Sequence, residues 1–552
     1  MFESYILQKI KVFIACLIDW YRYSVTEQVL VYTSTKLSAF CSESVLCKFI
    51  GKDERISDAW HDSLVFRWIE GLIKLIISCT NELYTVILKL GETSICFNGY
   101  KAFVKSQGKL YILKLICLAA VLFAGVLTLF ISPLKAFIIL AGIIAAAVTF
   151  LYFEIGLSLF IFGVFIIPHQ YWNNLYSIAA VIFYTIVYIM KVAVNKQYSF
   201  SIKVVDFIFL LFAFSVKLST LTSITPVESI KTMLFYAASL LLVVLLANSI
   251  HSRKGLNYLL LAVFAAVLLT SAYAVYQGIV GVEVDLALTD VELNQGMPGR
   301  VYSTLENPNN YAEYLILLVP FCVAYILNLQ NKNMQIFFGG ALSISFLALA
   351  LTYSRAGYVA FAITAFVFIA LRNWKLIPLA LVVGIVMLPF LPQSIMNRIM
   401  TISNFKDSSI SYRFYIWEGA LDMLKDYWIT GIGIGPEPFA RLSSNYMSSV
   451  VTKAAHSHML FLEIWIEMGI VAIISFMWCL IRTVKKSIKV IYSGQDKYLA
   501  NILIAGIAAL TGISFMGLVE YVWFYPRIMF AFWLVFAFMM ITLKLAAKEG
   551  NV

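Results

Sequence analysis

Residues 233–276, "MLFYAASLLLVVLLANSIHSRKGLNYLLLAVFAAVLLTSAYAVY", carry the pattern that decides the fold. Two apolar runs flank the short basic segment HSRKG at 251–255. Each run is long enough to cross the hydrocarbon core of a bilayer as a helix, which takes about 20 residues. We therefore expect two membrane-spanning helices joined by a short basic loop.

The remainder of the chain repeats this pattern. Hydrophobic residues make up 61% of the 552 positions and charged residues 13%, whereas soluble globular domains are about half apolar and about a quarter charged. This composition predicts an all-α, polytopic integral membrane protein with about 14 transmembrane helices. The expected spans lie near 111–132, 136–153, 155–168, 176–193, 204–219, 228–248, 256–278, 310–328, 334–353, 356–371, 376–391, 457–480, 499–519 and 527–545.

The short basic loops give the expected orientation. Lys and Arg concentrate in segments that fall on one side under this span count, and that side is the cytoplasm by the positive-inside rule. An even number of spans then places both termini in the cytoplasm. The net charge of +11 is explained by these loops and does not indicate nucleic-acid binding. The segments are HSRKG (251–255), LRNWK (371–375), RTVKKSIKVIYSGQDK (482–497) and KLAAKEG (544–550).

Residues 1–110 differ from the remaining chain, 111–552, which we expect to form the transmembrane domain. In "DSLVFRWIEGLIKLIISCTNELYTVILKL" (62–90) apolar positions return at helical spacing with charges between them. Arg67, Glu70 and Lys74 would be costly at the centre of a bilayer. We therefore expect amphipathic helices on the cytoplasmic membrane surface, or packed against the transmembrane domain.

Two long loops, 279–309 and 392–456, fall on the opposite, external side. In the second, "SYRFYIWEGALDMLKDYW" (411–428) has helical periodicity, and the GIGIG at 431–435 is typical of a helix stop. This loop is expected to form a helical external cap. None of the eight cysteines lies in either loop, so no disulfide framework is predicted.

Three arginines on the external side are candidate site residues. Arg355 is flanked by long apolar runs, which favours a functional role, although snorkelling to headgroups is an alternative. Arg413 is expected in the first turn of the loop helix, and Trp417 one turn on provides an alternative role for it through stacking. Arg300 fits an ordinary loop arginine equally well.

Polar residues beside the arginines complete the candidate set. Asn307 and Asn310 belong to an Asn-Pro-Asn-Asn turn, for which capping and turn formation are the simpler explanation. His456 and His458 lie at the mouth of a span, where a single histidine is usually structural. On a helix, residues two apart point to different sides, so we expect only one of the two to face a site.

Together these groups predict a chemistry. Arginines bind phosphate oxygens in a bidentate manner and keep their charge when partly desolvated, and a histidine can accept a proton from a hydroxyl. The set fits attack by an alcohol on a donor with a diphosphate leaving group. No acidic cluster with metal-ligand spacing and no Walker A motif are found, so neither a metal nor another cofactor is expected.

Four blocks in order resemble the O-antigen ligase/polymerase superfamily of bacterial membrane glycosyltransferases. They are "GRVYSTLENPNNYAEYL" (299–315), "TYSRAGYVAF" (352–361), "SYRFYIWEGALDMLKDYWITGIGIG" (411–435) and "AHSHMLFLEIWIEMGI" (455–470). The resemblance implies that Arg355 and Arg413 are the family's key arginines and that His458 is its histidine. It places Met459 where the family usually has Asn, and it offers no counterpart for residues 1–110.

The resemblance also implies a reaction, which is glycan transfer from an undecaprenyl-diphosphate carrier to an acceptor hydroxyl, without metal. It would take place at the outer face of the bacterial inner membrane, among membrane lipids. The acceptor stays open among lipid A core, another lipid-linked repeat unit (polymerisation) and a protein hydroxyl. A flippase for lipid-linked glycans is the alternative from another class, although no internal repeat typical of transporters is evident. A scaffold whose N-terminal region recruits enzymes is a third.

Overall fold

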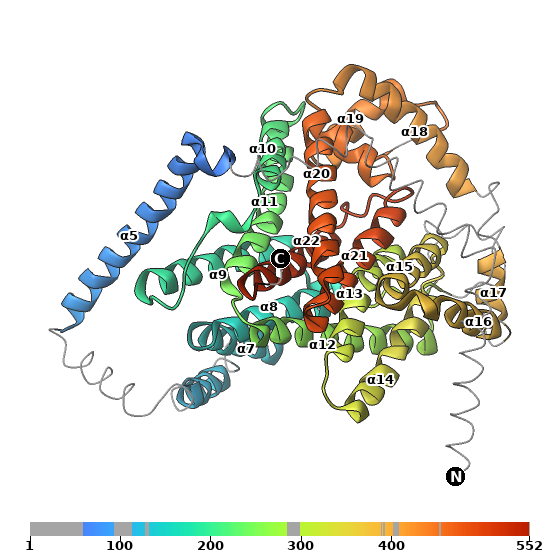
Figure 1. The fold of residues 1–552 in the computed structure, drawn as a ribbon. Helices are drawn as coiled ribbons and strands as arrows, with labels where there is room; N and C mark the ends of the chain where they lie inside the picture. Colours follow the sequence, from blue (N-terminus) through green and yellow to red (C-terminus); the bar gives the residue numbers. More distant parts are fainter. Residues whose placement is uncertain are drawn as a thin grey trace, which may run out of the picture.

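The computed structural model shows a helical protein with no strand among the residues it describes (Figure 1). The described residues are 59–92, 113–126, 128, 132–283, 299–387, 389, 392–400, 408–451 and 454–550. Residues 284–298 of the first expected external loop lie outside these ranges, as does most of the N-terminal region.

The helices follow one another with short connections, and most begin at a residue with a recognisable capping or proline signal. Asn307 and Asn331 cap helices with their side chains, and proline opens four others. The α-helices are α5 (Leu64–Glu92), α7 (Pro133–Leu151), α8 (Phe153–Ile166), α9 (Asn174–Val194), α10 (Phe207–Leu221), α11 (Pro226–Ser249), α12 (Arg253–Val280), α13 (Pro308–Leu327), α14 (Lys332–Leu351), α15 (Arg355–Asn373), α16 (Ile377–Met387), α17 (Gln393–Met400), α18 (Ser408–Tyr427), α19 (Pro436–Tyr446), α20 (Leu460–Ser493), α21 (Lys497–Met516) and α22 (Pro526–Lys548), with short 3-10 turns at His169–Tyr171, Ile202–Val204 and Trp374–Leu376.

Ten of the described helices are long and apolar enough to cross a membrane, which makes this a multi-pass membrane protein. Four shorter apolar helices coincide with further expected spans. The two spans expected at 356–371 and 376–391 form one apolar run, Arg355–Val386, that bends at a 3-10 turn. Leu64–Gly91 meets the same criterion. The total of about 14 spans and a surface position for the N-terminal region stay predictions.

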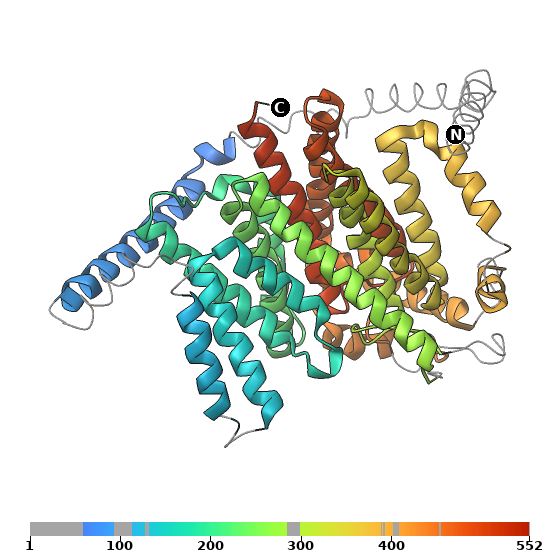
Figure 2. The same ribbon diagram turned by 90° about the horizontal axis from the view of Figure 1, so that it is seen from below.

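Helices α13, α21 and α22 form the centre of the bundle. Most of their residues are buried, including Tyr311, Tyr314 and Trp533. Figure 2 shows the last helices in the middle, with α7 to α9 on one side and α14 to α16 on the other. Helix α5 packs against α9 at the edge of this arrangement (Figures 1 and 2). The first residues of α13 and α22 and the last residues of α21 therefore meet at the same end of the bundle.

The opposite end is basic. Arg253 forms ion pairs with Asp496 and with Glu549, the latter at 2.6 Å, and Arg482 lies 3.1 Å from Asp206. These contacts join the ends of α10, α12, α20, α21 and α22. We call this the basic end and the opposite one the cap end, because α18 and α19 cover it.

The cap has its own apolar core. The helix expected over 411–428 is α18, and its residues Ile416, Ala420 and Met423 share one face at helical spacing. They are fully buried against α19 and the first turns of α20, where Leu462 and Ile466 belong to the same cluster. This second core fixes α18 over the start of α20 (Figure 1).

The GIGIG segment does more than end a helix. It runs beside α20, where the Ile432 amide donates to the Ile466 carbonyl at 2.8 Å and Gly433 donates to Glu467 at 3.1 Å. Helix α20 breaks at Gly469, which has φ 77°, in the region that favours glycine. A methyl group at Gly469 would overlap the Ile429 carbonyl oxygen. Close backbone contact, rather than helix termination alone, explains these glycines.

Candidate functional site

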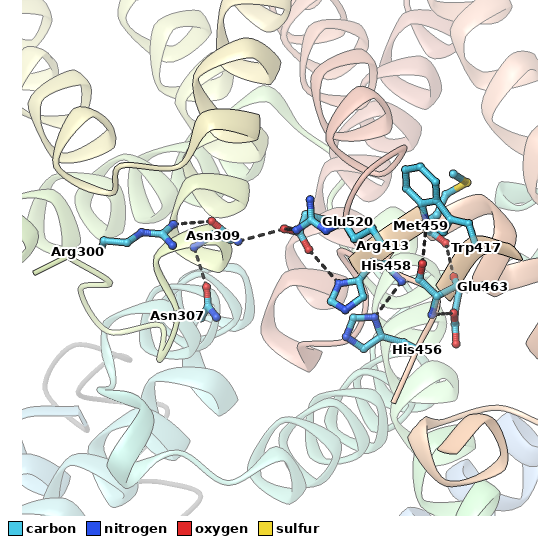
Figure 3. A network of polar contacts seen from close by, with 11 residues as sticks. Arg300, Asn307, Asn309, Arg413, Trp417, His456, His458, Met459, Glu463 and Glu520 are labelled. Carbon is cyan, nitrogen blue, oxygen red and sulfur yellow. Dashed lines mark hydrogen bonds and ion pairs between the residues drawn. The ribbon is translucent and has the colours of Figure 1, made fainter. Parts of the chain in front are cut away.

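Glu520 lies at the centre of a polar cluster at the cap end (Figure 3). It belongs to the loop between α21 and α22, at residues 517–525. Three side chains from other segments surround it: Asn309 in the first turn of α13, Arg413 on α18, and His458 just before α20. We call these four residues the Glu520 cluster. It joins parts of the chain that are more than two hundred positions apart.

The carboxylate of Glu520 is shared among its neighbours. Arg413 Nη2 lies 2.5 Å from Oε1, and Asn309 Nδ2 donates to the same oxygen at 3.1 Å. His458 Nδ1 lies 3.7 Å from Oε2, within ion-pair range but too far for a hydrogen bond. Burial alone raises the pKa of Glu520, but Arg413, His458 and His456 together lower it to about 2. Glu520 is therefore an anion that holds a cation and a histidine side by side.

Arg300 extends the cluster on the side of α13. Its Nη2 donates to Asn309 Oδ1 at 2.7 Å, and its Nε donates to the Thr352 carbonyl at 2.9 Å. Burial, followed by the neighbouring charge of Arg398, lowers the pKa of Arg300 to about 10, and Arg355 contributes in the same direction. Positive charge therefore gathers beside the anionic Glu520.

Arg355 and Arg398 bring further positive charge close to Arg300. Arg355 is the first residue of α15 and is half-buried, and the Ser354 side chain caps that helix. Arg398 on α17 is buried and donates to the Tyr353 carbonyl at 3.0 Å. Arg355 and Arg398, from two further segments, thus lie within electrostatic range of Arg300.

The asparagines divide between two roles. Asn307 caps α13, because its Oδ1 accepts the Asn309 amide at 2.8 Å. Helix capping, the simpler alternative to a role in the site, is therefore what the structure shows for Asn307. Asn310 is buried and lines a cavity on the other side of the α13 terminus. The asparagine that contacts the Glu520 cluster is Asn309, which the sequence reasoning passed over.

The expectation that His456 and His458 face different sides is wrong. It assumed a helix, but α20 begins at Leu460 and the segment before it is not helical. The two rings lie 4.1 Å apart, and the His458 amide donates to His456 Nδ1 at 3.1 Å. His458 has φ 53°, a conformation that is uncommon outside glycine. This backbone turn brings both imidazoles to the same place.

His456 is held as a neutral ring. It packs on Phe524 at 4.4 Å and on Tyr521 at 5.6 Å. Burial, and then the neighbouring His458, lower the pKa of His456 to about 3. A neutral ring that accepts a hydrogen bond at Nδ1 carries its proton on Nε2. His456 therefore supports the backbone of His458 and does not titrate near neutrality.

The residue between the histidines is clamped from both sides. The Ser457 amide donates to Glu463 Oε2 at 2.5 Å, and Trp417 Nε1 donates to the Ser457 carbonyl at 2.9 Å. Glu463 is fully buried on α20 and Trp417 lies on α18 (Figure 3). Two elements thus fix the peptide units that determine the direction of His458.

Trp417 and Arg413 differ from expectation. Because α18 begins at Ser408, Arg413 lies in the second turn and not in the first. Among the described residues no cation–π contact joins it to Trp417, whose ring packs edge-on against Phe414 at 5.2 Å. The guanidinium is held by Glu520 instead.

Met459 occupies the N-cap position of α20, where its side chain makes no cap. The adjacent Leu460 amide donates instead to the Gly517 carbonyl at 2.7 Å. A backbone group from the loop that carries Glu520 thus does the work of a capping side chain. The loop and the histidine segment are joined directly.

Glu520, Asn309 and Glu463 are the site residues that the sequence reasoning missed. One signal was available, since Glu520 is the only acidic residue between Asp496 and Glu549, and an acidic group in such a run is costly without a partner. In the described parts of the chain no group of three or more His, Cys, Asp or Glu side chains is arranged to hold a metal ion.

Comparison with known proteins adds a family to this geometry. Residues 340–477 match the family described as O-antigen ligase. The matched segment contains Arg355, Arg413 and His458, whereas Arg300 and Glu520 lie outside it. No curated protein matches the chain. The match covers residues 340–477 of the 552 in the chain, and over this segment the chain is similar to the O-antigen ligase family.

Proposed function

We propose that this protein transfers a glycan from an undecaprenyl-diphosphate-linked donor to an acceptor hydroxyl at the outer face of the bacterial inner membrane. Members of the matched family are ligases or polymerases that act on lipid-linked glycans. The observation that carries the proposal is the placement of His458 and Arg413 beside one largely buried carboxylate, that of Glu520. A base and a cation are thereby held within reach of one reacting group.

In the proposed reaction, His458 is the acceptor-facing residue. Its Nδ1 faces Glu520, which favours a proton on that nitrogen and leaves Nε2 to accept the proton of the acceptor hydroxyl. The hydroxyl oxygen then forms a bond to the anomeric carbon of the donor sugar, and the bond from that carbon to the diphosphate oxygen breaks.

The arginines serve the leaving group. Arg355, Arg413 and Arg300 come from three segments and surround the place where the diphosphate would lie. Their guanidinium groups offset the negative charge that develops as the bond breaks. Since these cations supply the electrostatic stabilisation, we expect transfer to continue in EDTA. The support for this arrangement is geometric: Arg413 Nη2 lies 2.5 Å from Glu520, and Arg300 reaches the same carboxylate through Asn309. Arg355 is close enough to Arg300 to lower its pKa.

The test is a transfer assay with purified protein, an undecaprenyl-diphosphate glycan and one acceptor class at a time. His458→Ala and Arg355→Ala are expected to lower product formation about 100-fold or more, the scale of a lost general base or charge-stabilising group. Arg372→Ala is a matched control, because Arg372 lies at the other end of the same helix, α15. His61→Ala serves the same purpose for the histidine.

Two results would contradict the proposal. Full activity of His458→Ala and Arg355→Ala would show that these two residues do not act in the reaction. Movement of intact lipid-linked glycan across vesicles, with no release of undecaprenyl diphosphate, would favour a transporter.

A further inference from the structure

A cavity of about 260 Å³ opens beside the Glu520 cluster. The first turns of α9, α13 and α22 line it, through Asn174, Asn310 and Pro526. It lies on a different face of the first turn of α13 from Arg300, since Asn310 lines it while the neighbouring Asn309 contacts Arg300 and Glu520. The cavity therefore adjoins the proposed reaction site without being part of it.

Arg527 is the buried cation of this cavity. It is 8% exposed, and it donates to the Ile167 carbonyl and to the Thr304 carbonyl, both at 2.8 Å. A guanidinium has five N–H donors. The two carbonyls fix its plane, and with respect to the described residues its other N–H groups can donate to a ligand in the cavity that Arg527 lines.

The other walls offer aromatic and polar surface. Trp172 is half-buried and lies 5.4 Å from the Arg527 guanidinium, and Tyr525 stands at the start of α22. Asn310 supplies an amide, and the exposed Glu306 supplies a carboxylate at the rim. Donors and acceptors of hydrogen bonds beside an aromatic wall are the groups that recognise a ring bearing several hydroxyls.

The size of the cavity limits what it holds. Sites for drug-sized ligands have about 300–1,000 Å³, so this cavity admits one sugar ring and not an oligosaccharide. We propose that it binds a single sugar residue of the glycan substrate, next to the reacting bond. This inference rests on the proposed function, because it assigns a second subsite for the same substrate.

A binding measurement tests the cavity without relying on turnover. In saturation-transfer-difference NMR with the full-length protein, methyl glycosides of glucose, galactose, N-acetylglucosamine and glucuronic acid are the probes. At least one is expected to give a signal that is lost in Trp172→Ala and weakened in Glu306→Gln. Trp374→Ala, at the basic end of α15, is the control and is expected to keep the signal. No signal from any probe, or a signal unchanged in both cavity variants, would overturn the inference.

A kinetic measurement then identifies the source of the sugar. With a donor carrying several sugars, Trp172→Ala is expected to raise KM about tenfold, equivalent to about 1.4 kcal/mol, with kcat unchanged. A donor carrying one sugar is expected to show no change. A rise in the acceptor KM instead would assign the ring to the acceptor glycan, and unchanged KM values for both substrates would exclude a subsite.

The two proposals fail separately. Sugar binding by a wild-type protein that shows no transfer would reject the proposed function and keep the cavity. Glycan transfer by the wild-type protein with no sugar binding in the cavity would keep the proposed function and reject the sugar subsite. Arg527→Gln is not the primary variant, because Arg527 joins two backbone segments and its loss affects folding.

Discussion

At the scale of single residues, Glu520 organises the candidate site. Replacing Glu520 with Gln removes the charge that holds Arg413 and leaves His458 facing an amide. Because both partners are largely but not fully buried, we expect a loss of about 1–3 kcal/mol in the free energy of unfolding, the scale of a hydrogen bond to a charged group. Turnover is expected to fall at least about tenfold, which corresponds to 1.4 kcal/mol in the barrier. Thermal unfolding and the transfer assay measure the two effects.

An exposed ion pair on α18, the helix that carries Arg413, is the control for that prediction. Asp422 lies 2.6 Å from Lys425, but both side chains are well exposed. Exposed pairs are worth about 0–1 kcal/mol, so Asp422→Asn is expected to leave stability and turnover nearly unchanged. Equal effects from Glu520→Gln and Asp422→Asn would show that Glu520 has no special position.

The residues that sequence reasoning selected and those it missed differ in one physical respect. Arg300, Arg413 and His458 are cationic or titratable groups in conspicuous surroundings, so their chemistry pointed to them. Glu520 and Asn309 belong to the site because of their contacts with side chains from distant segments. Such contacts depend on how the helices pack, which the local sequence pattern does not predict. The paired rings of His456 and His458 were missed for another reason, since helical spacing was applied to a segment outside the helix.

At the scale of elements, the break in α20 is set by backbone contact. Gly469→Ala would combine a left-handed conformation with overlap against the Ile429 carbonyl. We expect it to reduce the free energy of unfolding by at least about 2 kcal/mol, seen as a lower Tm. Gly494→Ala is the matched control, because Gly494 has φ 68° with no atom near the added methyl. It is expected to cost about 1 kcal/mol, and an equal cost at both sites would contradict the contact argument.

The sequence predicted helices where the apolar pattern was strong, and it did not predict the ends of helices or the connections between them. The apolar runs predicted most long helices, and α18 follows from its own pattern of apolar positions. The bend between α15 and α16 falls at the 3-10 turn Trp374–Leu376, inside an apolar run that gave no sign of it. The start of α20 at Leu460 and the course of the GIGIG segment are set by contacts with other parts of the chain. The Leu460 amide, for example, is satisfied by Gly517, a residue that no local capping pattern indicates.

At the scale of the whole molecule, the basic and cap ends make a prediction about sidedness. On a background without cysteine, Ser444→Cys places an exposed thiol on α19 and Lys489→Cys places one near the end of α20. A membrane-impermeant maleimide is expected to label the α19 position in intact cells, and the α20 position only after permeabilisation. This follows from the positive-inside rule. Labelling in the opposite order would reverse the orientation.

The position of Glu520 in the chain has a consequence for biogenesis. Synthesis proceeds from the N-terminus, so the three partners of Glu520, which are Asn309, Arg413 and His458, are all made before it. Gly517, whose carbonyl accepts the first amide of α20, is equally late. The segment that matches the family, 340–477, is therefore synthesised in full before Glu520, the carboxylate that Arg413 and His458 contact. The site is therefore complete only after the last two helices, α21 and α22, have joined the bundle.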